Sequence, residues 1–471
     1  MEKPILFLLN LLLCFLQFNG SSLRPSKVYG TADGSEEWGY VEVRPKVHVF
    51  WWLYRSAQRV ENSSTPWPTV LWLQGGPGAS GVGIGNFQEV GPLDTNLKPR
   101  NSTWLQRADL LFVDNPAGTG YSFVENTSSL VKTDEEAASD LTILLKKLYN
   151  NNERLQKSPL YAVAESYGGK FAVTLGLSVV KAIKSGQLNL TFGGVALGDS
   201  WISPEDYVVS VHLSWGPLLK DLSRLDINGV EKSNNLAKVI QKQISEGKYK
   251  EATDTWSQLE DVISENSNSV DFYNFLLDAA MDPLSVTSAA STTAAGTAAV
   301  RMTMRGYSRY LTSKAISTDS LEDLMNGVIK QKLKIIPKNV SWGGQSDLVF
   351  GSLEGDFMKP RINEVDELLS MGVNVTIYSG QIDLICATKG TEAWVQKLKW
   401  KGLQKFNNVE REPIYCENEI VTRGFFKSYS NLHFYWILEA GHFVPVDQPC
   451  VALRMISEIT QSPAKSSSAA F

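Results

Sequence analysis

Cysteine and histidine are scarce in this sequence, with four of each among 471 residues. Cys14 lies in an apolar N-terminal segment that we expect to be removed, which leaves Cys386, Cys416 and Cys450. Three thiols allow at most one intrachain disulfide, so the fold has to depend mainly on its hydrophobic core. We expect Cys416 to pair with Cys450, by elimination, because Cys386 lies in a loop that carries a candidate site residue.

Basic clusters and metal-binding spacings are also missing. The net charge is −5, and the lysine and arginine residues are dispersed along the chain. Binding of nucleic acid would need a basic stripe on the surface. Four scattered histidines and few cysteines give no zinc-binding motif. We therefore expect no nucleic-acid partner, no metal and no cofactor.

The N-terminus has the pattern of a secretory signal. A short segment with one lysine precedes the apolar run from Ile5 to Phe18, and small residues follow it. The run is too short to span a membrane, and no later segment is long and apolar enough to do so. We predict a signal peptide at residues 1–21, no membrane span, and a secreted or lysosomal protein. The alternative is a buried N-terminal helix.

Six sequons for N-linked glycosylation agree with this route. They lie at Asn62, Asn101, Asn126, Asn189, Asn339 and Asn374. The sequence does not show which of them are used.

Strand-like and helix-like segments alternate in the first half of the chain. Residues typical of strands fill 47–54, 69–73, 110–113, 160–163 and 192–197, and a helical pattern covers 133–148. Further on, strands are predicted at 373–379 and 432–439, and helices near 361–370 and 451–459. This alternation predicts an α/β fold in which helices cover a mostly parallel sheet.

The segment from 205 to about 339 has a different composition. Charged helical patterns dominate it, and residues 288–300 are of low complexity. We interpret 205–339 as a helical cap. It would separate a first core part at 22–204 from a second at 340–471, which ends in a disordered tail.

Ser166 lies in the stretch YAVAESYGGKF, residues 161–171, where a predicted strand meets a predicted helix. A nucleophilic serine on such a turn usually has glycine two residues before and after it. Gly168 is present, whereas Ala164 takes the place of the first glycine. The motif alone leaves open whether Ser166 is a nucleophile or an ordinary serine.

His442 is the best candidate for the base that a nucleophilic serine needs. His48 and His433 lie inside predicted strands, and His212 falls in the predicted cap. His442 follows a strand in the turn-rich segment EAGHFVPVDQP, and a loop after a strand is a usual place for a catalytic residue.

Asp383 also follows a predicted strand, in YSGQIDLIC. The chain order Ser166, Asp383, His442 is that of the α/β-hydrolases. In such a triad the acid would hold the imidazole tautomer and stabilise the imidazolium.

The glycine-rich loop LWLQGGPGASG, residues 71–81, follows an early strand. Its backbone N–H groups could stabilise an oxyanion, and we choose Gly76 and Tyr167 as donors. A phosphate loop is disfavoured, because no Lys-Ser/Thr pair follows the glycines.

Six blocks together resemble the serine carboxypeptidases, from about residue 70 to 450. They are LWLQGGPGAS, FQEVGPL, ADLLFVDNPAGTGYSF, AESYGGKF, YSGQIDLIC and AGHFVPVDQP, in this order. The resemblance implies an α/β-hydrolase fold and removal of C-terminal residues from peptides and proteins through an acyl-enzyme. It places the triad on Ser166, Asp383 and His442.

The resemblance further implies that Gln74, Gly75, Glu89 and Glu165 bind the terminal carboxylate of the substrate. Two neighbouring carboxyl groups hold a proton to a higher pH, so at acid pH the pair can donate a hydrogen bond. We therefore expect an acid pH optimum, which suits a lysosome.

Three residues depart from the family pattern. Gln74 stands in place of asparagine, Ala164 in place of glycine, and Ala79 in place of a cysteine found in many members. Cys386 matches a free thiol near the site in some members, and we expect it to line the pocket without acting as nucleophile.

Two other functions stay open: an acyltransferase with the same triad, and a non-catalytic binding or protective glycoprotein. The sequence also leaves open whether the chain forms a homodimer.

Overall fold

A computed structural model describes residues 28–60, 64–209, 214–279, 321–416 and 420–463. The predicted signal peptide, Asn62, His212, the low-complexity segment 288–300 and residues 464–471 lie outside the described residues.

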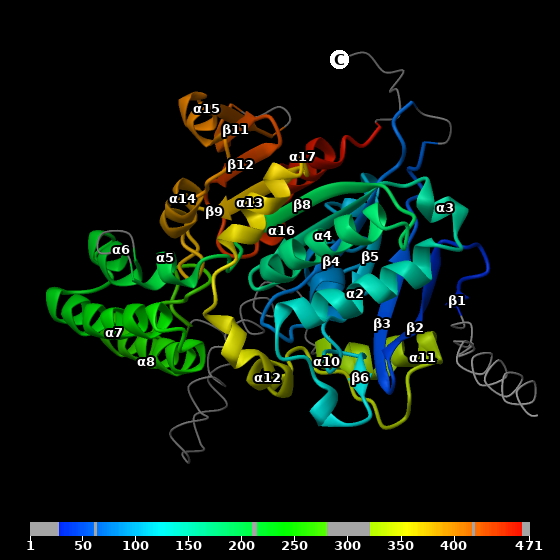
Figure 1. The fold of residues 1–471 in the computed structure, drawn as a ribbon, viewed down its shortest axis with the longest axis horizontal. Helices are drawn as coiled ribbons and strands as arrows, with labels where there is room; N and C mark the ends of the chain where they lie inside the picture. Colours follow the sequence, from blue (N-terminus) through cyan, green and yellow to red (C-terminus); the bar gives the residue numbers. More distant parts are fainter. Residues whose placement is uncertain (1–27, 61–63, 210–213, 280–320, 417–419, 464–471) are drawn as a thin grey trace, which may run out of the picture.

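The fold is built on one twelve-stranded sheet (Figure 1). Six neighbouring strands at its centre run parallel, in the order β5, β4, β7, β8, β9, β12. Their bounds are Asp109–Val113 for β5, Thr69–Leu73 for β4, Leu160–Glu165 for β7, Phe192–Gly198 for β8, Val375–Gly380 for β9 and Leu432–Ile437 for β12. The predicted α/β fold with a parallel central sheet is confirmed. Most residues of these strands are buried, as expected for a parallel sheet with helices on both faces.

Antiparallel strands extend the sheet at both ends. On one side β3 pairs with β5, β2 and the short β6, and β1 pairs with β2; on the other side β11 pairs with β12 and β10. Their bounds are Val28–Gly30 for β1, Glu36–Arg44 for β2, Val47–Tyr54 for β3, Phe123–Val124 for β6, Glu412–Tyr415 for β10 and Thr422–Tyr429 for β11. Of these, only β3 was predicted. The others are short or half-exposed, so no continuous apolar run marks them.

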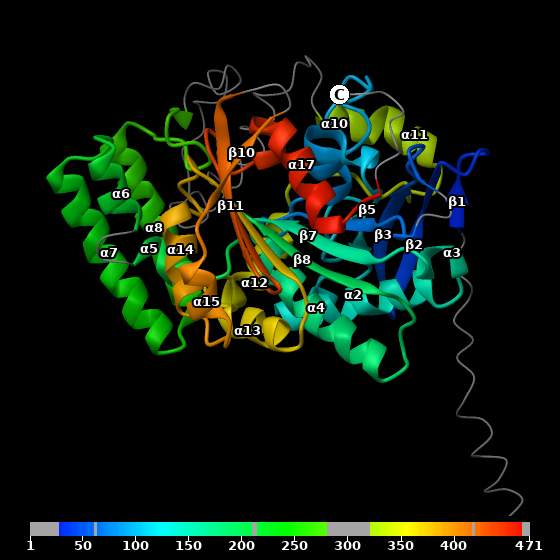
Figure 2. The ribbon, with the colours of Figure 1, turned by 90° about the horizontal axis from the view of Figure 1, so that it is seen from above.

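Helices cover both faces of the sheet. Figure 2 shows α2, α4 and α13 on one face and α17 on the other. These helices span Asp134–Tyr149, Gly168–Lys184, Ile362–Ser370 and Pro449–Thr460. The Thr133 hydroxyl accepts the Glu136 N–H and caps α2, whose first turn is acidic. Shorter helical segments are α3 (Glu153–Gln156), α14 (Thr388–Gln396), α15 (Leu403–Asn408), α16 (Val444–Asp447), η1 (Gly81–Val90), η2 (Trp104–Gln106) and η3 (Thr127–Ser129).

The described residues between 205 and 339 form helices and no strand of the sheet. They are α5 (Pro204–Val208), α6 (Trp215–Asp221), α7 (Ile227–Ser245), α8 (Tyr249–Ser267), α10 (Leu321–Leu324), η6 (Met325–Ile329) and α11 (Lys330–Leu333), and α12 (Asp347–Phe357) follows. Helices α7 and α8 pack against each other and lie with α6 at one end of the molecule (Figure 1). The bounds of the inserted cap stay a prediction. Within the described ranges no helix is both long enough and apolar enough to cross a membrane.

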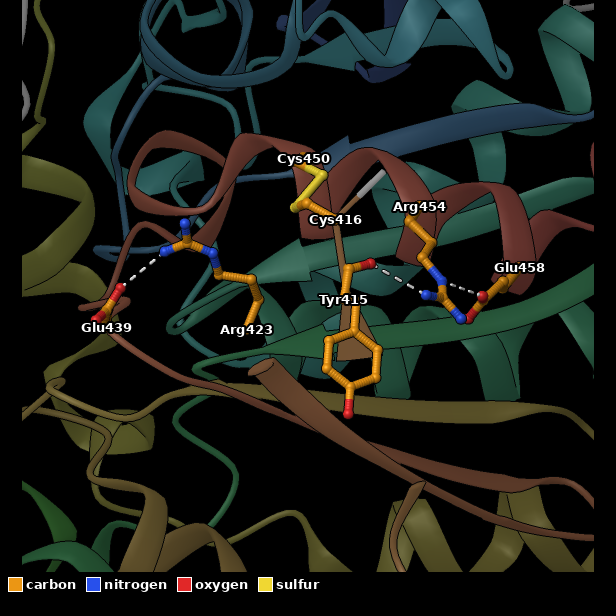
Figure 3. The surroundings of a disulfide bond; sticks show 7 residues. All are labelled: Tyr415, Cys416, Arg423, Glu439, Cys450, Arg454 and Glu458. Atoms are coloured by element: carbon orange, nitrogen blue, oxygen red, sulfur yellow. Dashed lines mark hydrogen bonds and ion pairs between the residues drawn. A yellow bond between two sulfur atoms is a disulfide. The ribbon is translucent and has the colours of Figure 1, made fainter. Parts of the chain in front are cut away.

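A disulfide joins Cys416 to Cys450, with Cα atoms 6.1 Å apart, and confirms the predicted pairing. It links the end of β10 to the first turn of α17 (Figure 3). On the same helix, Arg454 Nη1 donates to the Tyr415 carbonyl at 3.2 Å and Nε donates to Glu458 at 2.8 Å. The bond therefore fastens the antiparallel extension of the sheet to a helix on its face.

Replacing both cysteines with serine should lower the stability of the fold. The bond closes a segment of 34 residues, and the chain entropy of such a loop corresponds to about 3–4 kcal/mol. We expect a lower midpoint of thermal unfolding for Cys416→Ser/Cys450→Ser than for the wild type. A thiol reductant should lower the wild-type midpoint and leave that of the double variant unchanged. Equal midpoints for both proteins without reductant would contradict this role.

Candidate functional site

The carboxyl ends of four neighbouring parallel strands define the candidate site. Ser166 follows β7, Asp199 follows β8, Asp383 follows β9 and His442 follows β12. Because these strands run in one direction, the residues after them emerge at the same edge of the sheet. This edge is where open α/β sheets place their ligand sites.

Ser166 occupies a tight turn between β7 and α4. Its φ of 60° lies in the left-handed region, which is uncommon for a residue with a side chain. The backbone fixes this conformation, because Ser166 N–H donates to Gly198 O at 3.0 Å and Trp201 N–H donates to Ser166 O at 2.9 Å. Ala164, in place of the expected glycine, is fully buried inside β7. The sheet therefore accommodates the alanine methyl group without loss of the turn.

The start of α4 approaches the end of β4 closely. A Cβ atom at Gly168 would lie 2.2 Å from Leu73 O, so only glycine fits there. Beside it, the Tyr167 hydroxyl donates to Asp134 Oδ1 at 2.7 Å. Arg361 Nε donates to Asp134 Oδ2 at 2.9 Å, and all three side chains are buried. This network fixes the side chain of Tyr167, the residue immediately before α4.

His442 and Asp383 form a buried pair. His442 Nδ1 lies 2.8 Å from Asp383 Oδ2, and both side chains are fully buried. Burial lowers the pKa of the His442 imidazole to about 4, although nearby carboxyl groups act in the opposite direction. The imidazole is therefore neutral at mildly acid pH.

The glycine-rich loop lies directly against Ser166. A Cβ atom at Gly75 would lie 2.6 Å from the Ser166 Cβ and 2.9 Å from Tyr167 N. Gly76 follows with a φ of 105°. Ser80 ends the loop, where its hydroxyl donates to the buried Asp114 at 2.5 Å and accepts the Gly83 N–H at 3.0 Å. The Ser80 bonds thus fix one end of the loop, and the backbone at Gly75 lies next to the serine.

Gln74, Glu89 and Glu165 form a second buried polar cluster at the same edge. Gln74 Nε2 donates to Glu165 Oε1 at 2.8 Å and to Glu89 Oε1 at 3.0 Å. Trp72 Nε1 donates to Gln74 Oε1 at 2.6 Å and fixes the amide. Burial raises the pKa of Glu89, although its hydrogen bonds to Glu165 and Gln74 oppose this shift.

A segment after α8 connects the cap region to the loops of Asp383 and His442, and the sequence patterns did not indicate it. Phe272 O accepts the Leu384 N–H at 3.1 Å and the Ile385 N–H at 2.9 Å, while Tyr273 O accepts the His442 N–H at 2.8 Å. The Tyr273 ring lies 5.2 Å from the imidazole, centroid to centroid. These contacts join distant parts of the chain, so no local pattern could reveal them.

Cys386 is a free, buried thiol beside the His–Asp pair. Its sulfur and the ligand-type atoms of Asp383 and His442 lie within 4.8 Å of one another. Burial raises the pKa of the thiol well above its ordinary value, so Cys386 stays protonated and lacks the thiolate of a nucleophile. That the site needs no metal or cofactor stays a prediction.

Comparisons with known proteins identify the family. A family model described as serine carboxypeptidase matches residues 25–462. Serine carboxypeptidase-like 51 of Arabidopsis thaliana is 60% identical over 471 residues, 98% of this chain and 100% of that one. The retinoid-inducible serine carboxypeptidase of Homo sapiens is 46% identical over 432 residues, 92% of each chain.

A solved structure agrees on the fold. It is Kex1(delta)p, a prohormone-processing carboxypeptidase from Saccharomyces cerevisiae, with a TM-score of 0.73 over 90% of this chain and 91% of that one. At 19% identity this likeness concerns the fold alone. The architecture is that of an α/β-hydrolase. With the family model and the relatives at 60% and 46% identity, the chain belongs to the serine carboxypeptidase family of hydrolases.

Gly75→Ala should disrupt the site. The added methyl would collide with Ser166, and displacements of about 1 Å near reacting groups can cost about 100-fold in rate. We expect kcat/KM for peptide hydrolysis to fall by about 100-fold or more. Gly355→Ala is the matched control, because an added Cβ there meets nothing within 4 Å and the residue lies in helix α12. Wild-type activity in Gly75→Ala would show that the loop does not support Ser166.

Proposed function

We propose that this protein hydrolyses the C-terminal bond of peptides and proteins through an acyl-enzyme on Ser166, with His442 as the base and Asp383 as its orienting acid. The observation that carries the proposal is the buried 2.8 Å hydrogen bond between His442 Nδ1 and Asp383 Oδ2, at the sheet edge where Ser166 takes its left-handed turn. Geometry of this kind activates a serine hydroxyl in acyl transfer.

In the proposed first step, Ser166 Oγ attacks the carbonyl carbon of the scissile bond and His442 Nε2 takes the hydroxyl proton. Asp383 accepts the Nδ1 hydrogen and stabilises the imidazolium. The carbonyl oxygen gains negative charge, and the N–H groups of Gly76 and Tyr167 are the proposed donors to it. The place of Gly75 against Ser166 supports this assignment, because it brings the loop backbone next to the nucleophile.

Release of the amine and hydrolysis of the ester complete the proposed reaction. The imidazolium of His442 gives its proton to the leaving amine, so the C–N bond breaks and an ester on Ser166 remains. Water then attacks the ester, His442 takes a proton from it, and the acid product leaves as Ser166 recovers its hydrogen. The chain's own side chains supply every proton transfer in this sequence.

The cluster of Gln74, Glu89 and Glu165 is the proposed site for the terminal carboxylate of the substrate, together with the backbone of Gly75. Two ionised carboxylates would repel that group. Burial raises the pKa of Glu89, which supports a shared proton and a hydrogen bond to the substrate at acid pH. The Gln74 amide reaches both glutamates despite its extra methylene, which supports its place in this proposed site.

We further propose that the protein travels through the secretory pathway to the cell exterior or a lysosome. The apolar N-terminal segment and the disulfide support this route. The sequons Asn101, Asn126, Asn189, Asn339 and Asn374 all lie on exposed residues, where glycans can be attached. A homodimer stays a hypothesis.

Ser166→Ala should abolish hydrolysis while the fold is kept. We expect the secreted wild type to cleave an N-blocked dipeptide near pH 5 and to leave the same peptide with an amidated C-terminus uncut, because the amide offers no carboxylate. The variant should lose at least about 1000-fold in kcat. Products are followed by chromatography, and thermal unfolding confirms the fold. Equal cleavage of acid and amide would argue against carboxylate recognition. A folded wild type that cleaves nothing would favour a binding protein.

The pH profile should have its maximum on the acid side. With the His442 pKa near 4, kcat/KM should fall below about pH 4, because an imidazolium cannot take the serine proton. From about pH 5 to about pH 8 it should decline, because the glutamate pair loses its proton and KM rises. Glu89→Gln is the matched variant, since it keeps a donor that cannot ionise, and its KM should rise less with pH. A steady increase from pH 5 to pH 8 would contradict the proposal.

A further inference from the structure

Asp199 is a buried carboxyl group that the proposed reaction leaves without a role. It follows β8 with a φ of 38° and is 1% exposed. Its N–H donates to Tyr378 O at 2.9 Å, and its Oδ1 accepts the Gly380 N–H at 2.8 Å. These bonds hold the side chain against the end of β9, just before Asp383.

Asp199 and Asp383 are held beside each other by Gly380, whose N–H donates to Asp199 Oδ1 and whose carbonyl accepts the Asp383 N–H, and their side chains interact. One oxygen of each group, Asp199 Oδ2 and Asp383 Oδ1, is buried and makes no well-aligned hydrogen bond among the described residues, although the Ser379 hydroxyl is near Asp199 and the Cys386 and Ile385 N–H groups are near Asp383. Two ionised carboxylates can only accept, so they cannot bond to each other. Buried polar atoms are rarely left unpaired, and one proton between the two oxygens satisfies both.

The surroundings decide which carboxyl group holds the proton. Burial raises the pKa of both groups. The negative charge of Asp383 raises the pKa of Asp199 further. Asp383 is the group bonded to His442, since its Oδ2 lies 2.8 Å from Nδ1, and the N–H groups of Cys386 and Ile385 also favour its charged form, whereas Asp199 has one backbone donor, Gly380 N–H, and the Ser379 hydroxyl. The proton therefore belongs on Asp199 and the charge on Asp383.

We propose that Asp199 is a positioning residue: its protonated carboxyl group donates a hydrogen bond from Oδ2 to Asp383 Oδ1 and keeps Asp383 ionised and aligned with His442. The inference rests on the function proposed above, because it concerns the same triad. A protonated Asp199 also keeps the number of negative charges beside the His442 imidazole at one. If Asp199 ionised, a second negative charge would favour the imidazolium, which cannot take the serine proton.

The other groups that face Asp199 do not supply this effect. His442 lowers the pKa of Asp199, and the Ser379 hydroxyl and Gly380 N–H act in the same direction. Tyr378 and Cys386 also interact with Asp199, but burial raises the pKa of each well above its ordinary value. Both stay neutral while Asp199 titrates, so Asp383 is the anion that Asp199 faces.

The experiment uses a dialkyl phosphofluoridate, which labels an activated serine and carries no carboxylate. Its rate is therefore independent of carboxylate recognition by Glu89 and Glu165. The second-order rate constant would be measured from about pH 5 to about pH 9 for wild type, Asp199→Asn and Asp199→Ala, with thermal unfolding as a check of the fold.

We expect the wild-type rate to fall on the alkaline side as Asp199 ionises. Asp199→Asn should stay within about threefold of wild type at pH 5 and lose the alkaline fall, because its amide donates the same bond and cannot ionise. Asp199→Ala should be about 10- to 100-fold slower at every pH, the loss expected for a hydrogen bond to a charged group. An Asp199→Ala protein with the wild-type rate and profile overturns the proposal, and so does an alkaline fall that persists in Asp199→Asn.

Asp271→Asn is the matched control. The Asp271 charge also reaches His442, but its carboxyl group accepts the N–H groups of Tyr273 and Asn274 instead of contacting Asp383 by a hydrogen bond. The alkaline fall should persist in this variant. If the alkaline fall in labelling rate disappears in Asp271→Asn and persists in Asp199→Asn, the titrating group is Asp271 and the proposal is overturned.

A different result identifies failure of the proposed function itself. If Ser166→Ala is labelled as fast as wild type, or wild type is not labelled, Ser166 is not the nucleophile. The downfield proton resonance of the His442–Asp383 hydrogen bond then tests Asp199 independently of activity. It should titrate on the alkaline side in wild type and not in Asp199→Asn. Equal titration in both proteins overturns the proposal.

Discussion

The hydrogen bond between His442 and Asp383 is the interaction on which the site depends, because both side chains are fully buried. Neither group can exchange its partner for solvent, so each must find its charge balance within the protein. The low pKa of His442 is one result, and it leaves the imidazole neutral at mildly acid pH. A second result is the set of groups around Asp383. The backbone N–H groups of Cys386 and Ile385 and the neighbouring Asp199 side chain favour the ionised form of this buried carboxyl group.

Close packing around Ser166 is a second constraint on the site. The turn at Ser166, the start of α4 and the glycine-rich loop occupy a space that admits no extra methyl group at Gly75 or Gly168. The close approach gives the loop backbone access to the region in front of the serine. Alanine at position 164 is tolerated because it lies inside the strand and away from this contact. The two glycine positions of the turn are therefore not equivalent in this fold.

The contact between the cap region and the loops of the base and acid has a physical consequence. Carbonyl groups of Phe272 and Tyr273 accept backbone N–H groups from both loops, so the segment after α8 aligns one loop with the other. The segment after α8 and the relative placement of Asp383 and His442 are thus connected. Changes in the cap can alter the placement of His442 without touching it directly.

The sequence by itself determined the family, the parallel core strands and the positions of Ser166, Asp383 and His442, because strand patterns and the residues after each strand are local features. The pairing of Cys416 with Cys450 followed by elimination, because Cys386 lies in the loop of a candidate site residue. The antiparallel strands β1, β2, β10 and β11 escaped notice, since half-exposed strands carry little apolar pattern. The place of Asp199 after β8 was visible as a strand end, yet its contact with Asp383 was not. Only the tertiary structure decided that contact, the closeness of Gly75 to Ser166 and the bonds from Phe272 and Tyr273, because each depends on segments that are far apart in the chain and meet when the sheet is complete.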